Sequence, residues 1–235
     1  MNKLFASLIL TVLCCNSSFT QSKHQLGFVF GPNYFSLRGS DFLDETKSNF
    51  GISYGVSYEF ILNNRLSIVT GLSFEQKQID YNSKSEYYYV SEVGQILPLE
   101  YSFETKNKYQ YFTLPLLLKY NFGKKNLFFI NGGLFISSSG KYHKSSKITS
   151  EILYNYPINV EKNNFPFADD MSGVDYGISL GVGKSFRLNS KTKLSVELRD
   201  NFGLVNIIQD FNQSGENNTI KTNTLNLITQ LSFDL

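Results

Sequence analysis

Few residues in this sequence could support catalysis. The chain has two histidines, His24 and His143, among 235 residues. A lipid hydrolase would need a serine or an aspartate held at hydrogen-bond distance from a histidine. His143 has hydroxyl neighbours in the segment KYHKSSK, but adjacent residues do not make a catalytic pair. We therefore interpret His143 as a solvated loop histidine and predict no catalytic residue and no enzymatic activity.

Clusters of like charge suggest metal or phosphate chemistry instead. Asp169, Asp170 and Asp175 could coordinate calcium, because hard cations prefer carboxylate oxygens, but no complete ligand pattern accompanies them. The lysines of 141–147 could meet lipopolysaccharide phosphates as point charges. The sequence contains no phosphate-binding loop, zinc-protease, nucleophile-elbow or dinucleotide motif. We expect neither a metal nor another cofactor, and we interpret the acidic cluster as a hydrated turn.

Aromatic residues gather in the middle of the chain. Tyr87, Tyr88 and Tyr89, with 96–103, could form a hairpin that continues two strands beyond a membrane. Exposed aromatic clusters often mark binding surfaces, whereas tyrosines at a membrane–water interface anchor a protein in the bilayer. We favour the anchoring role for these tyrosines.

The composition excludes several classes of protein. The 22 Lys and Arg are balanced by 20 Asp and Glu, so no cationic field indicates binding to nucleic acid. No run of eighteen apolar residues occurs, which excludes a membrane-spanning helix. The 15 Tyr and 21 Phe are too many for a disordered chain.

Residues 1–20 are typical of a secretory signal peptide. Lys3 supplies the positive charge, and 4–13 form an apolar stretch too short to span a membrane. Thr20 would precede the cleavage site. A buried first helix is one alternative, and a lipoprotein modified at one of the two neighbouring cysteines is another.

Cleavage after Thr20 would leave one domain over 21–235. Both cysteines, Cys14 and Cys15, would be removed. The mature chain would then have no disulfide, no thiol nucleophile and no Cys-ligated zinc.

The remaining chain alternates between apolar and polar residues with period two. From Val174 to Phe186 every second residue is apolar except Lys184, and the residues between them are polar or glycine. A strand puts these two sets on opposite faces, whereas a helix would scatter them. The same pattern predicts eight strands, at 25–37, 50–61, 66–80, 109–122, 127–138, 174–187, 193–201 and 224–235.

Short and long connections alternate between these strands. The short ones are 62–65, 123–126 and 188–192, and the long ones are 38–49, 81–108, 139–173 and 202–223. Outer-membrane barrels show this asymmetry. The sequence therefore predicts an all-β fold, an eight-stranded antiparallel up-and-down transmembrane β-barrel with short periplasmic turns and long extracellular loops.

The two faces of each strand differ in size as well as polarity. The bulky apolar face suits lipid, and the face of glycine, serine and charged residues suits the crowded lumen of a small barrel. Charges in such a lumen are tolerated when they are paired. We expect a polar lumen network of Glu59, Glu75, Lys77, Lys119, Asp175, Arg187, Glu197 and Arg199. Its simplest role is to fill and hold the barrel.

Two other architectures share parts of this pattern. A soluble lipocalin-like barrel would also alternate, but its bulky face would line a cavity and its glycines would face water, where they weaken strands. A ten-stranded barrel would use 83–104 as two further spans, against which Pro98 and the poor alternation argue. Pro115 removes a ladder donor from its strand, which indicates a bulge or kink there.

Several segments carry a family resemblance. The segment 197–207, ELRDNFGLVNI, is similar to an E-x-R-x-x-x-G-L-x-N-I pattern, and 26–39 is similar to an opening strand with G-x-N-x-S-x-L. With 72–77 and 111–120, these segments resemble the PorT-like outer-membrane β-barrel family of Bacteroidota-type bacteria. Pro32 and the final Leu235 depart from the usual pattern. The resemblance implies the fold and an outer-membrane location, and no specific role.

We therefore expect an integral outer-membrane protein that acts through its extracellular loops in envelope structure, adhesion or as a secretion accessory. The alternatives are a porin-like channel for small solutes, a soluble lipocalin-like carrier and a lipid hydrolase that depends on His143. The expected partners are outer-membrane lipid and lipopolysaccharide, envelope proteins, and the outer-membrane assembly machinery through the C-terminal strand 224–235. No nucleic acid is expected.

Overall fold

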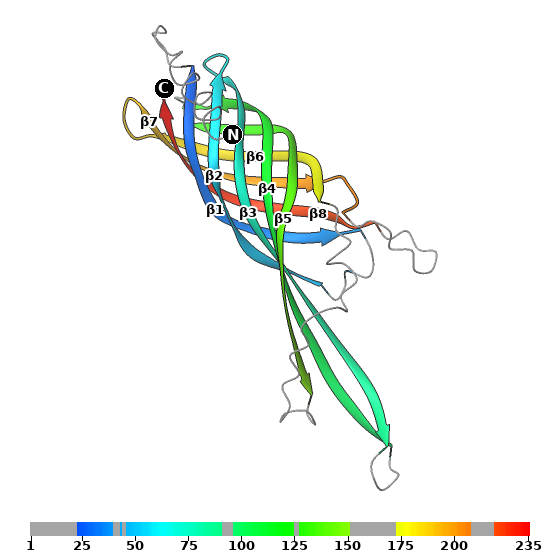
Figure 1. Ribbon diagram of the computed structural model, residues 1–235. Coiled ribbons are helices and arrows are strands. Elements are labelled where there is room, and N and C mark those ends of the chain that lie inside the picture. The colour runs from blue at the N-terminus through cyan, green and yellow to red at the C-terminus, as the bar shows by residue number, and fades with distance from the viewer. Residues whose placement is uncertain are drawn as a thin grey trace, which may run out of the picture.

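The computed structural model describes residues 23–39, 43, 46–90, 96–124, 127–150, 173–207 and 219–235. Eight strands in this part of the chain form one closed barrel, in which each strand pairs antiparallel with its sequence neighbours (Figure 1). The strands are β1 (His24–Arg38), β2 (Thr46–Ile61), β3 (Leu66–Val90), β4 (Ile96–Phe122), β5 (Phe128–Ser150), β6 (Val174–Arg187), β7 (Thr192–Gly203) and β8 (Lys221–Asp234). The predicted fold is confirmed, and the ten-stranded barrel is not formed. No helix in the described residues has the length and apolarity to cross a membrane.

The barrel closes between its first and last strands. The register of β1 against β8 places Gln25 opposite Asp234, so the start of β1 and the end of β8 lie at the same rim. The three short turns lie at that rim too. In two of them an asparagine side chain holds the turn: Asn63 Oδ1 accepts the backbone N–H of Arg65 at 2.8 Å, and Asn189 Oδ1 accepts that of Lys191 at 2.8 Å. In the third turn, Gly123 adopts a φ of 81°, which favours glycine.

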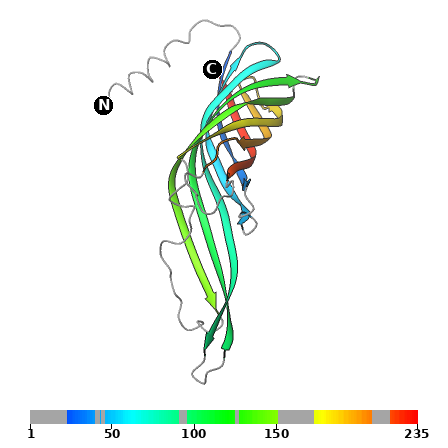
Figure 2. The same ribbon diagram turned by 90° about the vertical axis from the view of Figure 1, so that its right-hand side faces the viewer.

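Three strands continue far beyond the barrel at the opposite end. β3, β4 and β5 have 25, 27 and 23 residues, whereas the other strands have 12 to 16. The pairing of β2 with β3 stops at Tyr81 and that of β6 with β5 stops at Ser138, so only these three strands pair with one another further out. Figures 1 and 2 show them as a long projection. We call β3 beyond Tyr81, β4 before Thr105 and β5 beyond Ser139 the projection.

The projection corrects part of the sequence prediction. Much of the predicted loops 81–108 and 139–173 is strand, because β3 runs to Val90, β4 begins at Ile96 and β5 runs to Ser150. Period-two hydrophobicity detects strands that contact lipid, and these segments need no lipid-facing side. Their backbones pair with one another across the sheet.

The outer face of the barrel is apolar. Phe28, Phe50 and Leu134 have exposed fractions of 65%, 67% and 62%, and large apolar side chains on every strand share this exposure. The inner face carries small and polar side chains. This is the reverse of a soluble carrier barrel, so the lipocalin-like alternative is wrong and the outer face suits lipid.

The register shows where the strands are irregular. β3 and β4 keep the same register on both sides of Pro115, from Thr70 opposite Leu116 to Ser73 opposite Thr113, so no bulge occurs there. Thr70 Oγ1 instead donates a hydrogen bond of 2.8 Å to the Pro115 carbonyl. The register shifts lie elsewhere, between Ser48 and Ile52 of β2 and between Tyr109 and Tyr111 of β4.

An apolar cluster fills the barrel near the projection. Phe35, Ile79, Tyr109 and Tyr111 are at most 6% exposed and pack together, with Leu37 against them. Bulky side chains therefore occupy the lumen at the end opposite the short turns.

Candidate functional site in the barrel lumen

The charged side chains of the lumen occur in three groups along its length. Their side chains occupy the positions of the strands that point into the barrel, because successive side chains of a strand point alternately inward and outward. The groups centre on Glu59 near the short turns, on Glu197 at mid-height and on Glu75 near the projection.

Glu59 is the hub of the first group. Its carboxylate lies 3.0 Å from Lys119 Nζ and 3.3 Å from Lys193 Nζ, and it accepts a hydrogen bond of 2.6 Å from Ser67 Oγ. Glu59 is 2% exposed and Lys119 3%. Gln25 Oε1 accepts a further hydrogen bond of 2.7 Å from Lys193. Four strands thus meet on one buried carboxylate.

Glu197 and Arg199 form the second group on β7. Two hydrogen bonds of 2.5 and 2.9 Å join the guanidinium to the two carboxylate oxygens. Asn131 Nδ2 donates to the same carboxylate at 3.0 Å. Gly181 leaves the space for this contact, since a Cβ there would lie 2.4 Å from Asn131 Oδ1 and 2.6 Å from Glu197 Oε1.

The third group lies beside the apolar cluster. Lys77 Nζ is 3.1 Å from Glu75 Oε2 and 4.5 Å from the centre of the Tyr111 ring, so it is held by a carboxylate and an aromatic face together. Asp175 is fully buried and accepts a hydrogen bond of 2.6 Å from Thr222 Oγ1.

Arg187 lines the mouth of the lumen rather than its buried interior. Its side chain is 67% exposed at the rim and lies 3.6 Å from Asp234, which also accepts a hydrogen bond of 2.7 Å from Gln25. Arg187 is the last residue of β6. Although its strand position points it inward, the long side chain emerges into solvent where the barrel ends. The other seven predicted residues are buried inside the ring.

Among the described residues, the buried charges of the lumen balance. The buried carboxylates are Glu59, Glu75, Asp175 and Glu197, and the cations are Lys77, Lys119, Arg199 and the partly buried Lys193. Lys193 is absent from the predicted set. Its position was accessible to sequence reasoning, because it shares the inward parity of Glu197 and Arg199 on one strand.

Uncharged polar residues of the lumen hydrogen-bond one another as well. Asn33 Nδ2 donates to Ser53 Oγ at 2.8 Å, and Ser53 donates to Asn226 Oδ1 at 3.0 Å. Ser179 Oγ donates to Asn201 Oδ1 at 2.7 Å on the other side of the barrel. The sequence feature that could have predicted these hydrogen bonds is the presence of serine and asparagine at inward positions of the strands.

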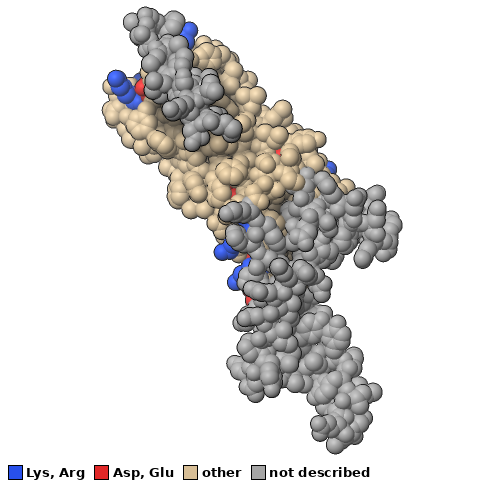
Figure 3. Space-filling view, in the orientation of Figure 1, with Lys and Arg blue, Asp and Glu red and all other residues tan. Residues whose placement is uncertain are grey.

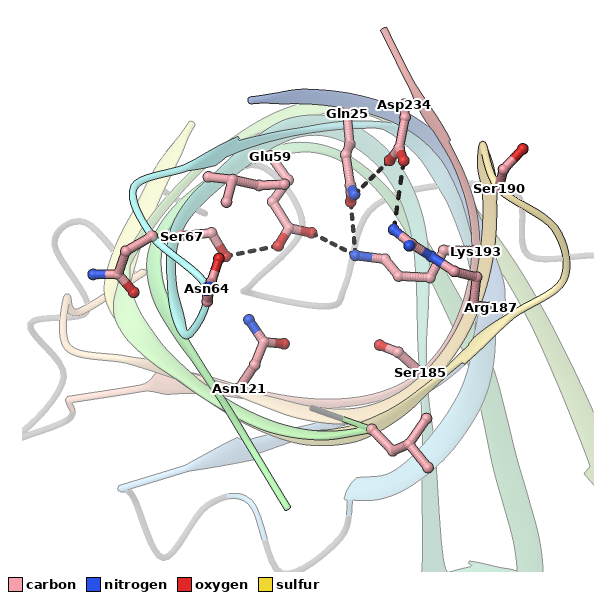
Figure 4. A pocket seen from close by; sticks show the side chains of 13 residues that line it. Gln25, Glu59, Asn64, Ser67, Asn121, Ser185, Arg187, Ser190, Lys193 and Asp234 are labelled. Atoms are coloured by element: carbon pink, nitrogen blue, oxygen red, sulfur yellow. Dashed lines mark hydrogen bonds and ion pairs between the residues drawn. The ribbon is translucent and has the colours of Figure 1, made fainter. Parts of the chain in front are cut away.

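A cavity of about 750 Å³ opens at the short-turn rim. Figure 4 shows Lys193 within it, joined to both Gln25 and Glu59, with Arg187 and Asp234 at the edge. Deeper in the lumen a second void, beside Glu75 and Arg199, measures only about 20 Å³.

The residues considered for catalysis or metal binding do not gather in the described structure. The side chains of His143 and of the lysines in 141–147 lie outside the described residues, as do Asp169 and Asp170, and the tyrosines 87–89. His24 Nδ1 is 2.6 Å from the Tyr58 hydroxyl on the barrel's outer side. Among described residues no three His, Cys, Asp or Glu side chains are placed to hold a metal ion.

The chain is similar to several solved structures at low sequence identity and low TM-score. Neisserial surface protein A is 12% identical with a TM-score of 0.43, over 92% of this chain and 100% of that chain. Ail of Yersinia pestis is 10% identical with a TM-score of 0.36, over 90% and 99%. OprG of Pseudomonas aeruginosa is 13% identical with a TM-score of 0.38, over 92% and 98%. No curated protein matches the sequence.

The family comparison covers most of the chain. A model described as outer membrane protein beta-barrel domain matches residues 17–209. The closed antiparallel barrel with an apolar outer face agrees with that description. The chain therefore belongs to the outer membrane protein beta-barrel domain family, and its location is the outer membrane.

Proposed function

We propose that this barrel is a non-enzymatic, non-conducting membrane anchor that holds the projection outside the cell. The projection would contact other envelope components, in envelope structure, adhesion or as an accessory in secretion. The observation that carries the proposal is the filled lumen. Glu59, Glu75 and Glu197 are in ion pairs within the ring, and the apolar cluster around Tyr111 occupies the end beneath the projection.

The position of the projection supports this role. It leaves the barrel at the end opposite the short turns, and outer-membrane barrels place short turns in the periplasm. Nine residues of β3 follow Tyr81, which at 3.3 to 3.4 Å per residue carry the strand roughly 30 Å further. A sheet of that reach can meet a partner away from the membrane surface.

Replacing 82–104 with an Asn-Gly turn tests the proposal. Tyr81 and Thr105 face each other in the register, so a two-residue turn can join them. Cells that lack the protein are compared with cells that carry the shortened chain, in adhesion, detergent resistance and protein export. We expect the shortened chain to reach the outer membrane and to fail in whichever assay the deletion affects. Full restoration by the shortened chain would contradict the proposal.

The second candidate function is a small-solute channel, which the rim cavity of about 750 Å³ favours. Single-channel recording in planar bilayers separates the two functions. We expect no discrete conductance steps from the full chain, because ion pairs and the apolar cluster fill the lumen past the cavity. Regular steps from a heat-modifiable, folded sample would establish a channel.

The motif of 197–207 supports a closer kinship with PorT-like barrels. Glu197 and Arg199 form the lumen ion pair, a Cβ on Gly203 would lie 2.3 Å from Thr222 Oγ1, and Asn206 Oδ1 accepts the Ile220 N–H at 2.9 Å. The motif thus has a structural role at each of these positions.

The proposal also includes how the chain is exported and how it is assembled in the outer membrane. Residues 1–20, outside the described part of the chain, would act as a signal peptide whose removal leaves 21–235. The assembly machinery would recognise the C-terminal strand 224–235, whose residues β8 contains almost entirely. N-terminal sequencing of protein extracted from outer membranes should begin at Gln21.

A further inference from the structure

The short-turn rim of the barrel is strongly cationic. The turns 62–65, 123–127 and 188–191 contain four Lys or Arg and no Asp or Glu. Arg65, Lys124 and Lys191 are exposed in the structure, and Lys23 is exposed at the start of β1. Among the described residues, the acidic side chains near this rim are Glu59, enclosed in the lumen, and Asp234, 19% exposed and beside Arg187. The excess of positive charge therefore lies on the outside of the rim.

Lys184 extends this charge onto the lipid-facing side of the barrel. It occupies an outward position of β6, and its Nζ lies 5.2 Å from the centre of the Phe128 ring and 4.9 Å from that of Phe186. No ion pair joins Lys184 to a described residue. An unpaired ammonium at an apolar surface is stable where its stem lies on apolar groups and its head reaches water or an anion.

Aromatic rings mark the level of the membrane interface at this end. Phe122 stacks on Phe128 with 6.1 Å between ring centres, and Tyr120 stacks on Phe122 with 6.4 Å. His24 of β1 stacks on Tyr58 of β2 with 5.9 Å between ring centres. Such a girdle lies at the headgroup level of a bilayer. The cations of the turns follow these rings directly in the chain, so they lie at or just beyond that level.

We propose that Arg65, Lys124, Lys184 and Lys191 form a binding surface for anionic phospholipid headgroups of the periplasmic leaflet. We call these four residues the headgroup ring. Charge complementarity carries the assignment, because basic side chains just outside the apolar layer attract anionic lipid. In Figure 3 the flank of the barrel is largely tan, with charged side chains gathered at its ends, so the phosphate level is where lipid can meet them.

Retention of lipid by the purified full-length barrel tests the proposal. Detergent-solubilised protein is mixed with phosphatidylglycerol or phosphatidylcholine, and bound lipid is counted by native mass spectrometry. We expect several-fold more phosphatidylglycerol than phosphatidylcholine to remain bound. The variant R65Q/K124Q/K184Q/K191Q should lose that preference while keeping its heat-modifiable mobility, since none of the four side chains is fully buried.

A matched variant controls for net charge. K47Q/K106Q/K108Q/K221Q removes four cations at the opposite end of the barrel, and it should keep the wild-type preference. An equal loss in both variants, or an unchanged preference in the ring variant, would overturn the proposal. Inorganic phosphate at the same concentration should not displace the bound lipid. Displacement by phosphate would show a site for free anions and would equally overturn the assignment to a lipid surface.

Discussion

At the scale of single residues, Glu59 matters most for the stability of the lumen. Lys119 and Lys193 lie 60 and 134 residues from it in sequence, and both reach its carboxylate. Two cations in a side-chain-filled interior depend on this one negative charge. Removing a partner from a buried ion pair leaves an uncompensated charge, which costs far more than the pair itself contributes.

We predict that Glu59→Gln, which keeps the shape of the side chain, lowers the free energy of unfolding by about 3–5 kcal/mol. Urea unfolding in detergent, followed by loss of the heat-modifiable band, measures the change. Glu104→Gln is the control, because Glu104 and its partner Lys106 are 47% and 51% exposed, and an exposed pair contributes only about 0–1 kcal/mol. Equal unfolding midpoints for the two variants would show that the Glu59 group does not stabilise the barrel.

Gly181 provides a second test within the lumen. Its missing side chain makes room for the contact between Asn131 and Glu197. We predict that Gly181→Ala destabilises the barrel by about 1–3 kcal/mol, the usual cost of overpacking. Gly140→Ala is the comparison, since the nearest atom to its added Cβ would be 3.5 Å away. The measurement is the midpoint of urea unfolding. An unfolding midpoint for Gly181→Ala as high as that for Gly140→Ala would mean that Glu197 can move aside without loss of stability.

At the scale of elements, the β3–β5 sheet has two parts with different environments. Inside the barrel each strand is paired on both sides and faces lipid, whereas the projection consists of three strands alone. The apolar cluster ends at Ile79 and Tyr109, so it belongs to the barrel part. The projection should therefore add little to the stability of the barrel.

The chain with 82–104 replaced by Asn-Gly should fold with an unfolding midpoint close to that of the full chain. All lumen ion pairs and the apolar cluster remain in it, and only pairing within the projection is removed. Urea titration of both chains, followed by heat-modifiable mobility, makes the comparison. Failure of the shortened chain to fold would show that the projection is needed to form the barrel.

At the scale of the whole molecule, closure makes the barrel cooperative. β1 pairs with β8 over much of its length, so no strand in the barrel has a free edge. Local opening would expose backbone groups to lipid, where they have no partner. We predict that unboiled protein runs at a different mobility from boiled protein on semi-native gels, with one transition as the temperature rises. A gradual shift in mobility would indicate strands that detach one at a time.

The sequence predicted the barrel in most respects. Alternation identified all eight strands, and small inward residues placed seven charged side chains in the lumen. The ends of β3, β4 and β5 were missed because alternation weakens outside the membrane. Arg187 lies at the mouth of the lumen because it is the last residue of its strand, where a long side chain that starts inward can still reach solvent.

The period-two alternation of apolar and polar residues by itself determined which side chains of each strand point outward and which point inward. The alternation of short and long connections determined the order of the strands around the barrel. Only the tertiary structure decided which charges meet. A face contains many inward positions, and contact across a lumen depends on the register of every strand between them. The sequence could place Glu59 and Lys119 inside, but closure of the barrel brought them to 3.0 Å. Register also decided where the lumen is blocked, since Phe35 and Tyr111 become neighbours only when β1 and β4 face each other across the ring.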